Sequence, residues 1–431
     1  MAWQVRNTAA LAECGISVTD VRVDFGAVMA RLRRLRSEIS ENDSAQRFAE
    51  KLGVNVFLGY ARFTSRNTVE VNGKVLRFVK AVIATGGAPK LLDIPGMKEA
   101  AAVEQEPRLV VTSANIFNLT TLPARLCVIG TGVVGMEMAQ AFQRLGSQVH
   151  VFGRSGRVLS KEDADVALLL QQELEREGVI FHLDVVSYLS VAHHGSEVTL
   201  DVATRTLARM SSTFDVMLVA VGRSPNVTKL NLEAAGVEFD VTTGVKVNDK
   251  LQTTNDRIFA VGDVCSPFQF THASDFMARM VIRNALFFGN AKFSSLLIPW
   301  CTYTSPEIAH VGLYAADLEA RGVVFEVYEK RFSENDRSIL DSEAVGMVRI
   351  LCKKGTDKIV GATIIGSHAG EIISEVSLAI QSGTGLSKLA SVIHPYPTTA
   401  DAIRACGDLY NRTRLTKTVR ALFRRVLALQ R

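Results

Sequence analysis

Cysteine is sparse in this chain of 431 residues, and its six copies are scattered. No two of them form a Cys-x-x-Cys motif or any other close pair. This spacing fits neither a metal site nor a disulfide framework, so we expect no bound metal and reduced thiols, as in a cytoplasmic protein. The six are Cys14, Cys127, Cys265, Cys301, Cys352 and Cys406.

Long apolar runs are also absent. No uninterrupted run approaches the roughly 20 residues needed to cross a bilayer, and the N-terminal patch "TAALAECGI" is broken by Glu13. We therefore expect neither a membrane span nor a signal peptide. With 47% apolar and 22% charged residues, the chain has the composition of an ordinary globular protein. Its length allows roughly two to four domains.

An excess of charge of one sign occurs only at the end of the sequence. Residues 412–431 contain seven basic and no acidic residues, and without them the formal net charge falls from +5 to −2. A general role in nucleic-acid binding therefore loses its support. Apolar residues in this tail recur at helical spacing opposite the arginines, which predicts a basic amphipathic helix. We favour docking of this helix on its own protein over contact with a membrane surface. The apolar residues are Val419, Leu422, Phe423, Val426 and Leu427.

The most informative segment is "LCVIGTGVVGMEMAQAFQRLGSQVHVF", residues 126–152. An apolar strand leads into a Gly-x-Gly-x-x-Gly loop, then into a helix-forming stretch, and then into an alternating strand. In this context the glycine pattern indicates a dinucleotide-binding unit rather than a simple turn. Gly130 permits the tight turn, Gly132 lets a pyrophosphate approach the backbone, and Gly135 lets the helix pack closely on the strand. The predicted cofactor-binding loop comprises Gly130, Thr131, Gly132, Val133, Val134 and Gly135.

The end of the second strand predicts which dinucleotide binds. An acidic residue there would bond the free 2′-hydroxyl of NADH and repel a 2′-phosphate. This sequence instead has Gly153 followed by Arg154, with Arg157 three residues further on. Guanidinium groups suit a dianionic phosphate, so the pattern favours NADPH over NADH. The alternative is that both arginines are solvated surface charges.

Six motifs occur in order along nearly the whole chain. They are "ATGGAP" from residue 84, "IGTGVVGME" from 129, "AVGRSPN" from 220, "TNDRIFAVGDVC" from 254, "TSPEIAHVGL" from 304 and "HPYPTTAD" from 394. With these motifs the sequence resembles the FAD-dependent pyridine nucleotide–disulfide oxidoreductase family, and especially its members of the mercuric reductase and dihydrolipoamide dehydrogenase type.

The resemblance implies an α/β fold with two Rossmann-like nucleotide-binding domains, the FAD one incomplete, and a C-terminal α+β dimerisation domain that forms a homodimer. The cofactors implied are FAD and NADPH or NADH. The implied parts are a first FAD segment (1–122), the NAD(P) domain (123–252), a second FAD segment (253–293), the dimerisation domain (297–410) and the basic tail (411–431).

The family's FAD domain opens with its own glycine loop, followed by a Cys-x-x-x-x-Cys redox pair. Residues 1–80 of this sequence contain neither. Without that loop the FAD pyrophosphate loses its cradle of N–H groups, and the parallel sheet loses an inner strand. The chain is then either part of a longer protein, which we favour, or a protein whose flavin binding has degraded.

The resemblance also implies individual cofactor-binding residues. Thr85 and Gly86 would approach the flavin through their backbone, and Asp263 would bond the ribityl chain, although it could instead cap the next helix. The start of that helix, near Ala273, would face the flavin pyrimidine. Glu137 would lie near the nicotinamide or simply on a helix face. Gly222 and Arg223 would lie beside the dinucleotides, unless Arg223 only ties loops together.

In "HPYPTTAD" the family's disulfide reductases have a His where this chain has Tyr396, and a Glu where it has Asp401. Their His–Glu pair is the acid–base group for thiols, whereas tyrosine, with a pKa of about 10, is a poor base at neutral pH. Mercuric reductases resemble this sequence in having Tyr there, facing the partner subunit's active site. Tyr396, Asp401 and His394 are the catalytic candidates, and the alternative for His394 is a turn or surface histidine.

Two functions are compatible with these features. The first is a flavoprotein oxidoreductase that passes hydride from NADPH to FAD and then electrons to an unspecified acceptor: a metal ion, a quinone or a disulfide. The second is a non-catalytic protein that binds NADP or dimerises after loss of its flavin site. Neither predicts a nucleic-acid partner.

Overall fold

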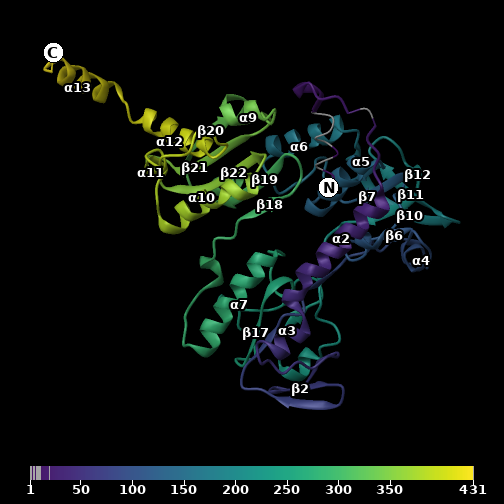
Figure 1. Cartoon of the computed structure of the whole chain (residues 1–431). Coiled ribbons are helices and arrows are strands. Elements are labelled where there is room, and N and C mark those ends of the chain that lie inside the picture. The colour runs from purple at the N-terminus through teal and green to yellow at the C-terminus, as the bar shows by residue number, and fades with distance from the viewer. Residues whose placement is uncertain (1, 3–4, 6–10, 19, 431) are drawn as a thin grey trace. The chain divides into compact units, whose positions relative to one another are not determined.

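The computed structural model describes residues 2, 5, 11–18 and 20–430. They form two compact units. The first comprises residues 1–156 and 178–296, and the second comprises residues 157–177 and 297–431, as far as these are described (Figure 1). The sequence places residues 157–177 within the predicted NAD(P) domain, but in the structure they group with the predicted dimerisation domain.

The first unit is built around a parallel sheet in the order β6-β13-β7-β8-β9. Its central strands β7 and β13 are buried along almost their whole length, as expected for parallel strands covered on both faces. On one side, the apolar face of an antiparallel sheet, β10-β11-β12, packs against Cys127, Phe152 and Met217. The strands are β6 (Val110–Val111), β7 (Arg125–Ile129), β8 (Gln148–Phe152), β9 (Ile180–His182), β10 (Val185–His194), β11 (Glu197–Thr204), β12 (Met210–Phe214) and β13 (Val216–Val219).

Helix α5 (Val133–Leu145) connects β7 to β8. It buries one face, including Gly135, Met136, Ala139 and Phe142, and ends at Gly146, whose left-handed backbone (φ 115°) closes the helix. The chain then enters β8, which pairs in parallel with β7. This strand–helix–strand unit is the βαβ unit that the sequence predicts.

The remainder of the first unit consists of short strands and four helices among the described residues. Strands β4 (Ala81–Ile83) and β17 (Ile258–Ala260) form a two-stranded parallel sheet. The other strands are β1 (Arg62–Ser65), β2 (Thr68–Val71), β3 (Lys74–Arg77), β5 (Gly87–Pro89), β14 (Arg223–Pro225), β15 (Phe239–Asp240) and β16 (Gly244–Val245). The helices are α2 (Phe25–Ser40), α3 (Ala45–Glu50), α4 (Met97–Ala102) and α7 (Thr271–Leu286).

The second unit is an antiparallel sheet in the order β18-β19-β22-β21-β20, with helices packed on it. Helix α10 packs on β19 and β22, and α12 packs on β20 and β21. The strands are β18 (Trp300–Thr302), β19 (Glu307–Gly312), β20 (Phe325–Arg331), β21 (Met347–Lys353) and β22 (Ile359–Gly366). The helices are α6 (Ala164–Arg176), α8 (Ala315–Ala320), α9 (Asp336–Leu340), α10 (Ala369–Ser382), α11 (Leu386–Leu389), α12 (Asp401–Thr413) and α13 (Lys417–Ala428).

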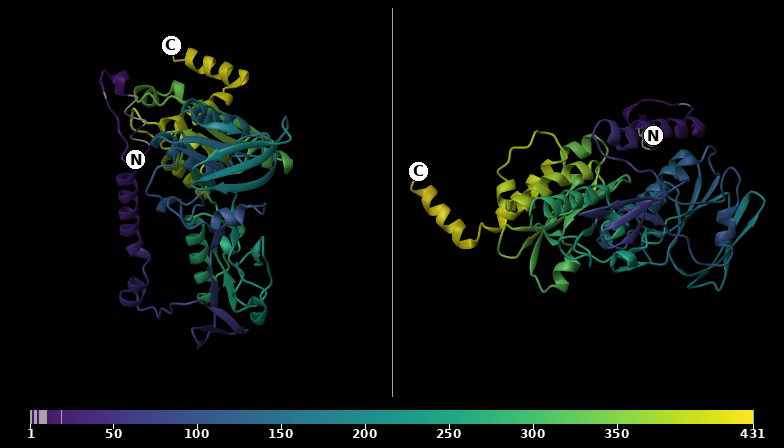
Figure 2. Two further views of the ribbon diagram at one scale, coloured as in Figure 1. Left: turned by 90° about the vertical axis from the view of Figure 1, so that its right-hand side faces the viewer. Right: turned by 90° about the horizontal axis from the view of Figure 1, so that it is seen from below.

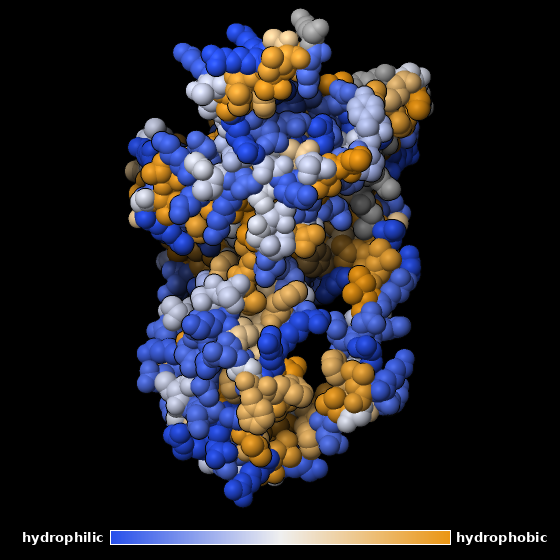
Figure 3. Space-filling model, turned by 90° about the vertical axis from the view of Figure 1, so that its left-hand side faces the viewer, coloured by the Kyte–Doolittle hydropathy of each residue, from blue (hydrophilic) through white to orange (hydrophobic). Residues whose placement is uncertain are grey.

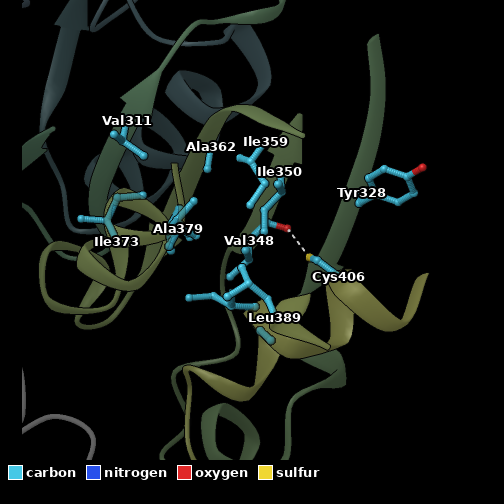
Figure 4. Close-up of a cluster of buried hydrophobic side chains, with 14 of the residues drawn as sticks. Val311, Tyr328, Val348, Ile350, Ile359, Ala362, Ile373, Ala379, Leu389 and Cys406 are labelled. Carbon is cyan, nitrogen blue, oxygen red and sulfur yellow. Dashed lines mark hydrogen bonds between the residues drawn. The ribbon is translucent and has the colours of Figure 1, made fainter. Parts of the chain in front are cut away.

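The core of the second unit lies between this sheet and its helices (Figure 4). Val348 and Ile350 from β21 meet Ile373 and Ala379 from α10 in one buried cluster. Cys406 of α12 is fully buried there, and its thiol lies 3.6 Å from the backbone oxygen of Val348. Burial raises the pKa of this thiol to about 12, so Cys406 is a core residue and not a reactive one.

A buried polar cluster fixes residues 157–177 within the second unit. The Glu162 carboxylate is 5% exposed and accepts hydrogen bonds from Trp300 Nε1 (3.1 Å) and the Tyr314 hydroxyl (2.6 Å). Burial raises the pKa of Glu162, although these two bonds oppose the shift. Close by, Arg349 pairs with Asp163 and Asp165 at the start of α6.

Helix α13 begins with a side-chain cap, because the Thr416 hydroxyl accepts a hydrogen bond from the Val419 N–H. The sequence correctly predicts this helix, but the prediction that it docks on its own protein is wrong. No residue of α13 is buried, and both views of Figure 2 show it standing clear of the other helices of the second unit.

The α/β fold class is confirmed by this mixture of a parallel βαβ sheet and an antiparallel sheet with packed helices. Within the described ranges, no helix is both long enough and apolar enough to cross a membrane.

The first prediction concerns His310, which is 1% exposed in the second unit. Its Nδ1 lies 2.8 Å from Thr363 Oγ1 and its Nε2 lies 3.3 Å from the Gly312 oxygen, so a neutral ring with hydrogen on Nε2 satisfies both partners. Burial lowers the pKa of His310 from 6.5 to about 4. The folded state thus favours the neutral form of His310. The contribution of this form to the free energy of unfolding is lost as the pH falls from 6.5 towards 4. The loss reaches about 3 kcal/mol.

The test compares urea unfolding of the wild type and His310→Gln between pH 7 and pH 4, monitored by fluorescence of Trp300, whose ring centroid lies 4.7 Å from that of His310. We expect the free energy of unfolding to fall more steeply with acidification in the wild type. Protonation of Glu162 acts in the opposite direction in both proteins and cancels in the difference. Parallel curves for the two proteins would contradict the prediction.

Candidate functional site

The glycine loop brings backbone atoms closer together than any other residue type would permit. A Cβ atom on Gly135 would lie 2.1 Å from the Gly130 oxygen, and one on Gly130 would lie 2.4 Å from the Ala220 oxygen. Gly130 also has a left-handed backbone, with φ 116°. The loop between β7 and α5 is therefore pressed against the end of β13, as the sequence predicts for these two glycines.

Gly132 is different, because a Cβ atom there would meet nothing within 4 Å. It is the N-cap of α5, and no side chain caps the first helical turn. Val134, in that turn, is 40% exposed. The helix start thus leaves open space in front of its N–H groups, which is the arrangement that binds a pyrophosphate. The remaining loop residues, Thr131 and Val133, flank this opening.

Arg154 and Arg157, the two arginines predicted to bind the 2′-phosphate, follow β8 and have different surroundings. Gly153 is buried, and a Cβ atom on it would lie 2.4 Å from Thr131 Cγ2, so no acidic side chain fits there without displacing Thr131. Arg154 is exposed, and its side chain has no hydrogen bond or ion pair with the described residues. The Arg157 guanidinium, in contrast, donates to the backbone oxygens of Ser160 (2.7 Å) and Glu162 (2.9 Å).

Two of the six motifs, "ATGGAP" and "AVGRSPN", pair with each other. Strands β5 and β14 are antiparallel, and they bring "ATGGAP" against "AVGRSPN". The Thr85 hydroxyl donates to the Asn226 oxygen (2.8 Å), and the Asn226 side chain donates to the Thr85 oxygen (2.9 Å). Gly86 and Gly222 each have positive φ, with open space where a Cβ atom would be. We call this element, residues 85–89 and 222–226, the clasp.

Asp263 follows β17 and lies against the clasp. Its Oδ2 accepts a hydrogen bond from Arg223 Nε (3.0 Å), and Arg223 also donates to the Gly87 oxygen. Arg223 thus ties two loops, which is one of its two predicted roles. Asp263 does not cap a helix, and its Oδ1 forms no hydrogen bond to the described residues. Ala273 is buried in the first turn of α7, and Glu137 is half-buried on α5.

A separate cleft of about 560 Å³ in the second unit contains all three catalytic candidates. The Tyr396 hydroxyl donates to Asp336 Oδ2 at 2.6 Å, and this bond raises the pKa of Tyr396. Asp401 pairs with Arg404 at 2.6 Å, which lowers the pKa of Asp401. Tyr396 and Asp401 therefore each have their own partner and do not form a pair in place of the family's His–Glu.

His394 is neither a surface residue nor unpartnered. Its side chain is 6% exposed, and Nε2 lies 3.0 and 3.1 Å from the two carboxylate oxygens of Glu375, on α10. Nδ1 lies 3.0 Å from the Val392 oxygen. The alternative of a surface histidine is wrong. Sequence reasoning missed Glu375 and Asp336, because each is distant from the motif along the chain and only the fold brings it there.

With this geometry, the fold and its two sites are those of a dinucleotide-dependent oxidoreductase with an interface domain. Two family models match the chain: the pyridine nucleotide-disulphide oxidoreductase model over residues 10–280 and the dimerisation domain of the same family over residues 298–406. The chain belongs to the pyridine nucleotide-disulphide oxidoreductase family.

Curated relatives and a solved structure agree with this assignment. The chain is 30% identical over 398 residues to mercuric reductase of Lysinibacillus sphaericus, covering 92% of this chain and 71% of the relative. Against mercuric reductase of Staphylococcus aureus it is 31% identical but spans only 64% of the relative's length, with 84% of this chain covered. The fold is similar to that of the HOCl-induced flavoprotein disulfide reductase RclA of Escherichia coli, with TM-score 0.81 and 25% identity over 90% of this chain and 86% of that one.

Family membership confirms several predictions. The family comprises FAD-dependent NAD(P)H oxidoreductases, and the chain carries the family's dimerisation domain. No comparison tests the individual site residues or the domain boundaries, which stay predictions.

The second prediction compares Gly135, which packs against a backbone oxygen, with Gly132, which faces open space. Gly135→Ala places a methyl group against the Gly130 oxygen and should lower the free energy of unfolding by about 1–3 kcal/mol. Gly132→Ala meets open space and has φ −80°, which alanine adopts freely, so stability should be unchanged.

The same Gly132→Ala methyl group occupies the approach to the helix start, so the Kd for NADPH should rise about tenfold or more. Thermal unfolding and a fluorescence titration with NADPH measure the two effects. Unchanged NADPH affinity in a folded Gly132→Ala protein would contradict this role of the loop.

Proposed function

We propose that this chain binds NADPH at the glycine loop, passes hydride to FAD and sends electrons on to an acceptor: a metal ion, a quinone or a disulfide. The observation that carries the proposal is the open helix start at Gly132, between the close backbone contacts of Gly130 and Gly135. These contacts leave the N–H groups of the first turn of α5 available to a pyrophosphate.

The preference for NADPH over NADH rests on two features at the end of β8. Gly153 offers no carboxylate to a 2′-hydroxyl, and Thr131 fills the space that such a side chain would need. Arg154 is exposed and has no competing partner in the described part of the chain. A free guanidinium binds a dianionic phosphate through paired charge-assisted bonds. Arg157 contributes less, because its guanidinium holds the Ser160 and Glu162 oxygens.

The clasp fits the flavin end of FAD. Asp263 Oδ1 is left to accept a hydroxyl hydrogen, Arg223 fixes the carboxylate through Oδ2, and Gly86 and Gly222 keep side chains out of the space beside it. Bound FAD would accept the hydride and relay its electrons. Residues 1–80 hold no glycine loop for its pyrophosphate. Apolar side chains on β4 and α7, such as Val82 and Phe276, are 47% and 58% exposed.

Flavin content is therefore the first quantity to measure. Purified protein is titrated with NADPH and then with FAD, and absorbance is followed across the visible flavin bands. Saturable NADPH binding and bleaching of bound flavin by NADPH would support the proposal. The comparisons do not support the alternative, a remnant that has lost its flavin site. Colourless protein that binds NADPH but takes up no FAD would restore it.

The cleft around Tyr396 is the proposed site for the acceptor, completed by the partner subunit in a homodimer. Tyr396 donates a hydrogen bond to Asp336, which raises the pKa of Tyr396, so the protonated phenol is a poor base. His394 is better placed to exchange a proton. Its Nδ1 lies 3.0 Å from the Val392 oxygen, which can only accept a hydrogen bond, and its Nε2 lies 3.0 Å from a Glu375 carboxylate oxygen. We propose His394 as the acid–base group and Glu375 as its positioning residue.

A cytoplasmic location also stays a prediction.

The third prediction tests the dinucleotide preference. Arg154→Gln removes the free guanidinium and should raise KM for NADPH about 10- to 100-fold while leaving KM for NADH nearly unchanged, because hydrogen bonds to charged groups contribute about 1.5–3 kcal/mol. Arg205→Gln is the matched control, since Arg205 is also an exposed arginine of the first unit and its side chain has no bond to the described residues. An equal change for both cofactors would refute the proposed phosphate contact.

The fourth prediction tests the acid–base pair. With a quinone or a disulfide as acceptor, which takes up protons on reduction, His394→Gln should lower kcat about 100-fold. Glu375→Gln should lower it less, because the first variant removes the proton carrier and the second only its partner. The rate of flavin reduction by NADPH, measured by stopped flow, should stay unchanged in both variants, since the cleft serves the acceptor.

His368→Asn is the control for both variants. His368 is exposed, its side chain has no bond to the described residues, and its left-handed backbone (φ 61°) accommodates asparagine. Slowing of flavin reduction equal to the slowing of acceptor reduction would show that His394 acts on the whole fold rather than on the acceptor step.

A further inference from the structure

Helix α13 separates apolar and basic residues onto opposite faces. At 100° per residue, Val419, Leu422, Phe423, Val426 and Leu427 fall within one stripe, and Lys417, Arg420, Arg424 and Arg425 fall on the other side. The only other side chains in the helix are those of Thr418, Ala421 and Ala428. The helix therefore has a continuous apolar face and a continuous basic face.

Nothing in the described part of the chain covers the apolar face. Leu422, Phe423 and Leu427 are 57%, 51% and 59% exposed. Figure 3, viewed from the side of α13, shows apolar surface gathered next to hydrophilic surface at the upper end of the molecule. A patch of this kind on an otherwise folded protein indicates a binding surface.

The basic face is equally unpartnered. The side chains of Lys417, Arg420, Arg424 and Arg425 form no hydrogen bond or ion pair with the described residues. The segment 412–431 holds seven basic and no acidic residues. An internal ion-pair network of the described residues therefore does not explain this charge, and the basic face is left open to an anionic surface.

The combination of the two faces decides between the candidate occupants. A nucleic acid would pair with the arginines but leave the apolar stripe in water, and the rest of the chain, with a net charge of −2, offers it no continuation. A second copy of α13 would bury the apolar stripe but leave the basic face of each helix, on the opposite side, without an anionic partner. A bilayer with anionic headgroups satisfies both faces at once, with apolar side chains at the acyl boundary and guanidinium groups among phosphates.

We propose that α13 binds the surface of an anionic lipid bilayer, lying in its plane with Phe423 and Leu427 inserted. A single short helix of this kind binds weakly and reversibly. Two copies joined by the family's dimerisation domain would strengthen the attachment, because the second helix then binds at a high effective concentration. The attachment is independent of the chemistry at the glycine loop.

The experiment is sedimentation of the full chain with large vesicles of phosphatidylcholine alone or of phosphatidylcholine mixed with phosphatidylserine. We expect binding to the anionic vesicles at least tenfold stronger, and loss of the difference at high salt. Arg424→Gln/Arg425→Gln should weaken anionic binding about 30-fold, because each basic residue near such a surface contributes about fivefold.

Phe423→Ser/Leu427→Ser tests the apolar face and should abolish sedimentation with either vesicle. Leu207→Ser is the control, since Leu207 is also 51% exposed but lies in the first unit. Circular dichroism and NADPH binding show that each variant is folded. Two results would overturn the proposal: equal binding to both vesicles, or no vesicle binding by the folded wild type. In the second case, a change of oligomeric state in Phe423→Ser/Leu427→Ser would identify a second copy of the chain as the occupant of the apolar face.

Discussion

The first unit depends on a contact that only glycine permits, between the backbone of the glycine loop and its neighbours. Gly130 lies against Ala220 at the end of β13, and Gly135 brings α5 down onto the Gly130 oxygen. These two contacts set the position of the helix start relative to the carboxyl ends of β7 and β13. In parallel α/β sheets, ligands bind at this edge, where neighbouring connections diverge. The same packing that closes the core therefore also creates the opening at Gly132.

The clasp gives a structural reason for the likeness of "ATGGAP" and "AVGRSPN", which share the pattern Ala-x-Gly-x-x-Pro. Each motif ends a strand, at β4 or β13, and each continues into a short strand that pairs with the other. Thr85 and Asn226 exchange two hydrogen bonds across this pair, and Arg223 joins both to Asp263. In the proposed function the clasp holds the flavin end of FAD, so a rigid joint there would keep the hydride acceptor in a fixed position.

Local sequence patterns predict the local elements of this structure well. They do not predict the side-chain contacts between segments that are distant along the chain. The βαβ unit, the glycine roles and α13 each depend on residues within about 30 positions, where periodicity and glycine spacing are informative. Arg157 shows the limit of this reasoning. Its type and position suit a phosphate, but its guanidinium holds the oxygens of Ser160 and Glu162. Glu375 and Asp336 lie 19 and 60 residues from their partners, and no sequence pattern marks either pair.

In the second unit, the tyrosine at position 396, where the family's disulfide reductases have a histidine, changes which residue can exchange a proton. With tyrosine at position 396, the hydroxyl donates to Asp336, and this carboxylate stabilises the protonated phenol. Asp401, one methylene shorter than glutamate, is held by Arg404 on its own helix. Neither residue then offers a proton acceptor near neutral pH, whereas the imidazole of His394 already lies against Glu375. An acceptor that needs protons during reduction would therefore depend on His394, while a metal ion that only takes electrons would not. The effect of His394→Gln on different acceptors thus distinguishes the acceptor classes left open by the sequence.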